Sequence, residues 1–449
     1  MKGSKRRRNE TPIGLWTLVA LIIANMIGSG LYTSSCYSIL GLGEARYVLA
    51  VWGLGGIMAL CGAVAYGALA ERLPMAGGEY LYLSRLVHPV IGFLAGWISL
   101  IAGFTAPIAA AALIVGKYTT PYAGANSYWP QIIASLTIIL AASAHGFHLR
   151  TGAWLQNAVV LLKVVCLVLF LILAIIFGPE KGWQSGNLAT LPLANASSLS
   201  VFAAMMGSLV WISLSYTGFN AAIYLAGELP KGDRRIPLSM WIATLIVTFL
   251  YMALNAVFLY AIPAEKLAGN EEFVADVAQA IGGGSLEGLI RFAIVISSAT
   301  AVLAMLMAGP RVYAQMAADG VMPRLFAARR QIPHRAIVIQ AALSLIVVWV
   351  AKLNDLIGYL GLTLSACGAL AIASIWWLPS KLPESKPIRL HEHLSAAVFV
   401  AFSVVLLFAA YADPLKSAQF WACMITFAIG GCLYAVMVIR RRNVAGDSH

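Results

Sequence analysis

Long apolar runs separated by short polar segments constrain this chain more than any other feature. A run of about 20 residues crosses a hydrocarbon core of ~30 Å. Twelve such runs occur, at 13–38, 47–71, 89–118, 128–145, 152–177, 199–227, 237–261, 288–312, 336–351, 356–378, 394–411 and 418–439. Only 11% of the 449 residues are charged, too few for the surface of a soluble domain. The sequence therefore predicts an all-α protein with twelve transmembrane helices.

Lysine and arginine are distributed unevenly between the two sets of connecting loops. Most of the 30 basic residues fall on the side that holds a basic tail at 1–12 and a second tail at 440–449. Because positive loops stay in the cytoplasm, both termini are predicted to be cytoplasmic. This bias also accounts for the net charge of +12, so nucleic-acid binding is not expected.

Two of the predicted spans are interrupted by glycine and polar residues. The first contains "IIANMIGSGLYTSS" (22–35), and the sixth contains "LSYTGFNAAIY" (214–224). Unwinding a helix in lipid exposes backbone N–H and C=O groups, and each group without a partner costs several kcal/mol. Such a break is tolerated only where it lines a polar cavity or binds a ligand. Matching interruptions five spans apart predict an inverted repeat. Its halves would be 13–178 and 199–378, with 394–439 appended.

The chemistry of the two breaks suits an α-amino acid. A half-helix beginning near Gly30 presents free N–H groups and the positive end of its dipole to a carboxylate. Carbonyls released at Met26 and Ile27, and near Leu214 and Ser215, suit an ammonium. The alternative is that these glycines and serines only allow helices to pack closely.

Three further segments favour the ligand-binding interpretation. They are "LPMAGGEYLYLSR" (73–85), "GELPKGDRRIP" (227–237) and "AGPRVYAQMAADGVMP" (308–323). Together with "IGSGLY", in this order and spacing, they resemble the amino acid–polyamine–organocation superfamily, and most of all bacterial amino acid permeases related to the L-type amino acid transporters. The resemblance implies a five-plus-five inverted repeat of the LeuT type, alternating access, an amino acid substrate and a bacterial inner membrane.

The resemblance also implies which residues contact substrate. They are Met26, Ile27, Gly28, Ser29 and Gly30 in the first break, and Leu214, Ser215, Tyr216, Thr217 and Asn220 in the sixth span. The family commonly has an aromatic residue over the substrate at the position of Leu214 or Tyr216. Since Leu214 is aliphatic, Tyr216 is the expected lid.

Lys163 lies about midway along the apolar fifth span. A charge at that depth costs ~2.5–3.5 kcal/mol, so it normally faces a cavity with partners. The alternative, a side chain reaching the interface, requires too long a path at ~1.5 Å per residue. Sodium-independent members of the superfamily carry a lysine here, in place of a bound cation. The resemblance therefore implies sodium-independent transport, with Lys163 accompanied by Ser297 or Ser298.

The spans that would line the site carry no acidic residue, which favours neutral amino acids over cationic ones. A cationic amino acid or polyamine exchanger, and a sensor that binds without transporting, remain alternatives. Exchange and proton coupling also both remain open. No motif indicates an enzyme, a cofactor or a metal site. The outer loop 119–130 has no cysteine, so a disulfide-linked accessory subunit is not expected.

Charged residues gather at the predicted cytoplasmic ends of the spans. They are Glu71, Arg72, Glu79, Glu228, Asp233, Arg311 and Asp319. Ion pairs among them would close an inner gate. Ordinary loop charges of small energetic effect are the alternative.

Overall fold

The structure is a computed structural model that describes residues 14–74, 78–121, 124, 127–146, 152–190, 192–193, 195–229, 233–318, 322–327, 333–414 and 416–446. Over these residues the chain is helical, and the one extended pairing is an isolated bridge between Glu44 and Asn187. The predicted tail 1–12 lies outside the described residues, as do 75–77, 230–232 and 319–321 of the family motifs. The second predicted tail begins inside a helix, because α17 continues to Gly446.

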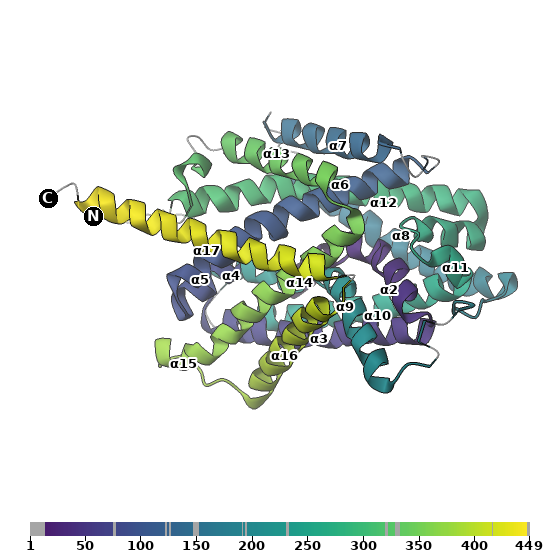
Figure 1. The fold of residues 1–449 in the computed structure, drawn as a ribbon, viewed down its shortest axis with the longest axis horizontal. Coiled ribbons are helices and arrows are strands. Elements are labelled where there is room, and N and C mark those ends of the chain that lie inside the picture. The colour runs from purple at the N-terminus through teal and green to yellow at the C-terminus, as the bar shows by residue number, and fades with distance from the viewer. Residues whose placement is uncertain are drawn as a thin grey trace.

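The first part of the chain contains α1 (Leu15–Met26), η1 (Ser29–Tyr32), α2 (Ser34–Leu42), α3 (Ala45–Arg72), α4 (Gly78–Leu86), α5 (Pro89–Ile98), η2 (Ser99–Thr105), α6 (Ala106–Thr119), α7 (Trp129–Gly146) and α8 (Gly152–Lys181). The second part contains α9 (Ser198–Ser215), η3 (Ala221–Glu228), α10 (Arg235–Ala261), α11 (Ala264–Leu267), α12 (Phe273–Ala318), η4 (Arg324–Phe326), α13 (His334–Val350), α14 (Leu353–Ala373), η5 (Ser374–Trp377) and α15 (Leu378–Lys381). The last two helices are α16 (Leu390–Ala412) and α17 (Ser417–Gly446), and α17 projects beyond the rest of the bundle (Figure 1).

Nine helical segments of the described chain are long and apolar enough to cross a membrane. The other three predicted spans correspond to the shorter apolar helices at Leu15–Met26, Trp129–Ala144 and His334–Val350. The first of these is short because the chain leaves the helix after Met26. The protein is therefore a multi-pass membrane protein, and the count of twelve spans stays a prediction.

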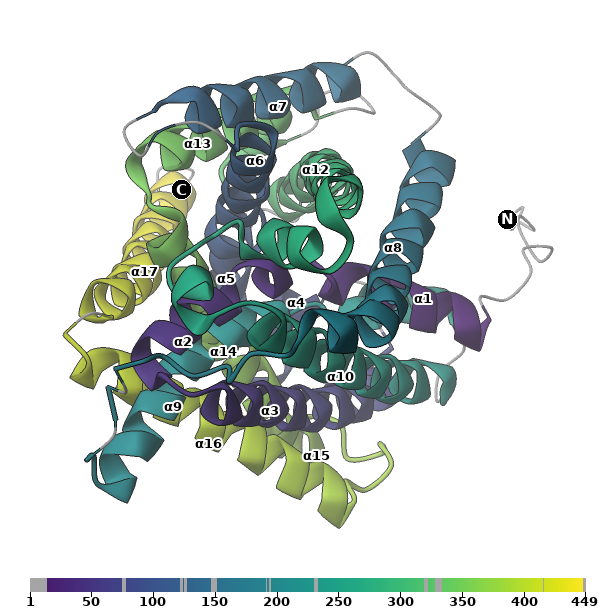
Figure 2. The same cartoon turned by 90° about the vertical axis from the view of Figure 1, so that its right-hand side faces the viewer.

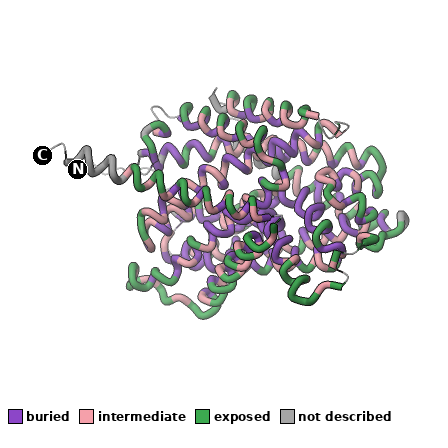
Figure 3. The backbone as a smooth tube through the Cα atoms, in the orientation of Figure 1, coloured by how far each residue is buried: buried purple, intermediate pink, exposed green. Residues whose placement is uncertain are grey.

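The outer surface of the bundle is apolar. Buried residues lie in the middle of the bundle and exposed residues on its outer faces (Figure 3). Large side chains on those faces are well exposed, among them Val350 at 79%, Phe408 at 69% and Leu140 at 68%. Such a surface is unfavourable in water but suits lipid, where hydrophobic side chains need no covering layer.

Close helix packing surrounds the interrupted spans. Helix α10 lies along α3, and α12 is seen end-on between α6 and α8 (Figure 2). Glycines permit the approach of α3 to α10: a Cβ at Gly56 would lie 2.3 Å from Thr248, and one at Gly67 would lie 2.6 Å from Pro237. Small residues at such contacts allow the backbones of membrane helices to approach closely. Helix α1 packs against α10, and α2 packs against α9.

Candidate functional site

The first predicted interruption is a break in the backbone between α1 and η1. Gly28 has φ −139° and ψ −159°, which is extended backbone, and η1 then leads into α2 at Ser34. Lys163 on α8 approaches the break and donates hydrogen bonds to the carbonyls of Ala24 at 3.1 Å and Ile27 at 2.5 Å. The lysine thus bonds to the backbone of the first span just before the break.

The second interruption separates α9 from η3. Residues 216–220 form turns, and Gly218 has φ +95°, a left-handed conformation that side chains with a Cβ rarely adopt. A Cβ at Gly218 would also lie 2.9 Å from the carbonyl carbon of Asn25. Thr217 closes the turn locally, because both its N–H (3.0 Å) and its hydroxyl (2.7 Å) donate to the carbonyl of Leu214.

The two breaks are in direct contact. A Cβ at Gly30 would lie 2.8 Å from the Cα of Ser215 and 2.9 Å from its nitrogen, so only glycine fits there without displacing the backbone. Ser34 joins the two spans as well: its hydroxyl donates to the carbonyl of Trp211 at 3.1 Å and lies 3.2 Å from the Ser215 hydroxyl. Of the predicted residues, Gly30 of the first break and Ser215 of the second therefore lie against each other.

Tyr251 on α10 bridges the two breaks and was not predicted. Its hydroxyl lies 2.7 Å from the carbonyl of Met26 and 3.0 Å from the carbonyl of Ser215. A hydroxyl has one hydrogen to donate, so it satisfies one of these two acceptors at a time. The other carbonyl is left as an acceptor for a donor such as an ammonium. The sequence signal was weak, because the same span also carries Thr244, Thr248 and Asn255.

Tyr216, the expected lid, is held in place by its neighbours in this conformation, and its role as a lid stays a prediction. It is 3% exposed, and its hydroxyl donates to the carbonyl of Trp52 on α3 at 2.8 Å. Its ring packs against Trp52 and Tyr251, with centroids 5.8 and 5.3 Å away. The tyrosine therefore anchors the second break to α3 in this conformation. Leu214, the other position considered, is 8% exposed.

Ser297 and Ser298 on α12 are buried at 8% and 6% exposure. Among the hydrogen bonds between described residues, none joins either serine to Lys163; the backbone carbonyl of Ser297 accepts instead from Thr300. Their predicted association with the lysine stays a prediction.

Asn220 ends the second break and faces an acidic residue. Its Nδ2 donates to Oε1 of Glu79 at 3.2 Å, and the Tyr66 hydroxyl donates to the same oxygen at 2.6 Å. Glu79 was expected in a cytoplasmic ion pair. In the described part of the chain it forms none and is held by neutral donors.

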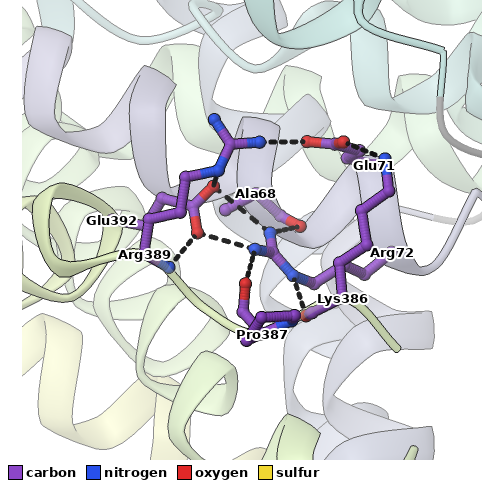
Figure 4. A network of polar contacts seen from close by, with 7 residues as sticks. All are labelled: Ala68, Glu71, Arg72, Lys386, Pro387, Arg389 and Glu392. Carbon is purple, nitrogen blue, oxygen red and sulfur yellow. Dashed lines mark hydrogen bonds and ion pairs between the residues drawn. The ribbon is translucent and has the colours of Figure 1, made fainter. Parts of the chain in front are cut away.

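The other predicted gate residues also have partners different from those expected. Arg72 donates to Glu392 at 2.7 Å and to the carbonyls of Ala68, Lys386 and Pro387 (Figure 4). Glu71 accepts from Lys386 at 2.9 Å and Arg389 at 3.5 Å. These contacts fix α3 to the start of α16.

The remaining gate residues form local contacts. Asp233 pairs with Arg235 at 2.5 Å, and Arg311 donates to the carbonyl of Met307. Asp319 and the side chain of Glu228 lie outside the described residues. Across the described residues, no ion pair joins two members of the predicted gate, and the gate stays a prediction.

Comparison with known proteins places these features in a family context. The amino acid permease family profile matches residues 13–437. The serine/threonine exchanger SteT of Bacillus subtilis is 26% identical over 352 residues, covering 77% of this chain and 78% of the exchanger. The human large neutral amino acids transporter small subunit 2 is 24% identical, covering 92% of this chain and 78% of that protein. The mouse b(0,+)-type amino acid transporter 1 is 26% identical over 58% of this chain and 53% of its own length.

Proposed function

This chain belongs to the amino acid permease family, within the amino acid–polyamine–organocation superfamily, and from that premise we propose that it is a sodium-independent transporter of neutral L-amino acids that works by alternating access. The family and its relatives are transporters, so the chain is not an enzyme. The proposal extends from amino acid transport in general to a substrate class and a mode of coupling.

The observation that carries the proposal is the contact of Lys163 with the first break. An ammonium is bonded to the carbonyls of Ala24 and Ile27, which are the kind of oxygens that hold a coupling cation in a broken span. A covalently attached cation makes a bound sodium ion unnecessary at that position. Exchange and proton coupling both fit this arrangement, and transport measurements are needed to separate them.

The packing of the helices supports a five-plus-five inverted repeat as part of the proposal. A two-fold relation between the halves would equate the first span with the sixth, the second with the seventh and the third with the eighth. Equivalent helices α3 and α10 pack together, and so do α6 and α12. The contact of α1 with α10 has its counterpart in the contact of α9 with α3.

Neutral substrates are favoured by the composition of the two breaks. They offer backbone carbonyls, the Tyr251 hydroxyl and small side chains, and the lysine already supplies one positive charge. The relatives named for serine, threonine and large neutral amino acids are consistent with this class.

We further propose that both termini are cytoplasmic in a bacterial inner membrane, because the basic loops and tails fall on one side. We also propose that the protein works without a disulfide-linked subunit. All six cysteines are free thiols, and none lies in the outer loop 119–130.

Uptake into liposomes tests the function directly. Purified full-length protein is reconstituted, and radiolabelled L-serine or L-leucine is supplied in sodium-free buffer, with and without internal amino acid, at two pH values. Uptake that requires internal amino acid identifies an exchanger. Uptake into empty liposomes that grows with an inward proton gradient identifies proton coupling. Absence of both, or an absolute need for sodium, overturns the proposal.

A cationic amino acid or polyamine exchanger is the second candidate, and Glu79 is the observation that favours it. This carboxylate lies beside Asn220, and no described cation forms an ion pair with it. One relative is named as a b(0,+)-type transporter. Stronger competition by arginine or putrescine than by leucine against labelled serine would favour this candidate.

A further inference from the structure

Glu79 connects three parts of the protein at the second break. It is the second residue of α4 and receives hydrogen bonds from three neighbours. The Tyr66 hydroxyl of α3 and the Asn220 amide donate to Oε1 at 2.6 and 3.2 Å, and the Cys367 thiol of α14 donates to Oε2 at 3.3 Å. Both carboxylate oxygens are thus engaged.

The charge of Glu79 has no counter-ion among the described residues. The titratable side chains near it are Tyr66, Tyr224 and Cys367, which are neutral near pH 7. Helices α5 and η5 also pack on α4 and carry no charged side chain. Helix α4 lies outside the candidate membrane spans, and burial raises the pKa of the Glu79 carboxyl. A carboxylate in such a position acts through its hydrogen bonds instead of through an ion pair.

A second contact fixes α4 against η3, the helix that follows the break. Gly78 has φ +59°, and a Cβ there would lie 2.6 Å from the ring of Tyr224. The start of α4 therefore contacts the segment 220–224 at two adjacent positions, once through a glycine and once through a carboxylate. Any shift of this segment relative to α4 has to alter both contacts.

We propose that Glu79 is a positioning residue that sets the orientation of the Asn220 amide at the second break. With Nδ2 held by the carboxylate, the amide oxygen of Asn220 remains as the acceptor for substrate. Loss of Glu79 releases this amide and lowers substrate affinity, whereas the translocation step is largely retained. This inference rests on the proposed function, because it assigns a role within the same transport site.

Kinetics of four variants test the inference in the liposome assay with labelled L-serine and L-leucine. Glu79→Ala removes a charged acceptor, and we expect KM to rise about tenfold with kcat within about twofold of wild type. Glu79→Gln retains an oxygen for Tyr66 and Asn220, so KM stays within about threefold.

The other two variants remove the Asn220 donor, first alone and then with a new donor supplied at position 79. Asn220→Asp places two carboxylates in contact, and they cannot both be ionised, so uptake falls at about pH 7.5 and recovers at about pH 5.5. Glu79→Gln combined with Asn220→Asp exchanges donor and acceptor. We expect this double variant to exceed Asn220→Asp at the higher pH and to lose the pH dependence.

Three results overturn the inference. The first is an unchanged KM in Glu79→Ala, and the second is a double variant no better than Asn220→Asp. The third is a loss of arginine competition in Glu79→Gln with serine KM unchanged, which would make Glu79 a substrate contact for cationic side chains. If the wild-type protein takes up neither amino acid, the proposed function fails instead, and the two failures are thereby distinguished.

Discussion

The two breaks satisfy their exposed backbone in different ways. The carbonyls of the first break are bonded by side chains distant in sequence, Lys163 of α8 and Tyr251 of α10. The second break is closed mainly by its own residues: Thr217 bonds to Leu214, and Gly218 makes the left-handed turn. The first break therefore depends on the assembly of the whole bundle, whereas much of the second is encoded locally. Variants that remove a distant donor should affect transport most.

Lys163→Ala is expected to have the largest effect. It leaves the carbonyls of Ala24 and Ile27 without their donor, and buried unpaired polar groups cost ~1–3 kcal/mol each, so we expect uptake to fall about 100-fold. The measurement is initial uptake in liposomes, without and with sodium. Lys163→Arg is the matched control, since it keeps a positive charge. Wild-type rate and pH dependence in Lys163→Ala would contradict the role given to this residue.

Gly218→Ala is expected to have the next largest effect, on the locally encoded break. The left-handed φ and the contact with Asn25 at 2.9 Å both oppose a Cβ, with a strain of ~1–3 kcal/mol. We expect a lower melting temperature in detergent and uptake reduced about tenfold.

Gly28→Ala is the control for that substitution. Gly28 has extended backbone, and the nearest atom to an added Cβ is 3.9 Å away, so its melting temperature should equal that of wild type. If Gly28→Ala lowered the melting temperature as much as Gly218→Ala does, the left-handed conformation of Gly218 would not be the cause of the effect. Backbone flexibility at both positions would then explain it.

Tyr251→Phe tests the bridge between the breaks. It removes one hydroxyl shared by the carbonyls of Met26 and Ser215, a loss of ~0.5–1.5 kcal/mol, so KM should rise about three- to tenfold. Tyr216→Phe is the comparison, because that hydroxyl bonds to Trp52 on α3. Its KM should change less than that of Tyr251→Phe. The reverse order would support Tyr216 as the lid over the substrate.

Thr217→Val should have the smallest effect. The carbonyl of Leu214 keeps its hydrogen bond from the Thr217 N–H at 3.0 Å, so only a second donor is lost. We expect uptake within about threefold of wild type, corresponding to less than ~1 kcal/mol. A loss as large as that of Gly218→Ala would indicate that the hydroxyl contacts substrate directly.

Several features of the site were predictable because local chemistry marks them. Glycine and serine at 28–30 and at 215–218 signal breaks, since they are poor helix formers inside spans that otherwise favour helix. The lysine at mid-span signals a partner inside the protein, because a charge at that depth is costly without one. Which backbone it meets was implied only by the family resemblance.

Other features were not predictable because they depend on which helix faces which. Arg72 was assigned to a gate, yet it pairs with Glu392, far away in sequence and preceded by no motif. Glu79 was assigned to the same gate, and nothing in the sequence indicated that Asn220 would lie beside it. The resemblance indicated the family, but these pairings come from the rotation and depth of each helix.

By itself, the sequence determined that the chain crosses a membrane many times, where two of its spans break, and that a lysine lies buried at mid-span. Hydropathy, glycine and a buried charge each act over only a few residues, so a local pattern reveals them. Only the tertiary structure decided that Tyr251 bridges the breaks, that Tyr216 is anchored to α3 and that Glu79 holds Asn220. A hydrogen bond needs two atoms about 3 Å apart, and residues distant in the sequence reach that separation only when the helices pack.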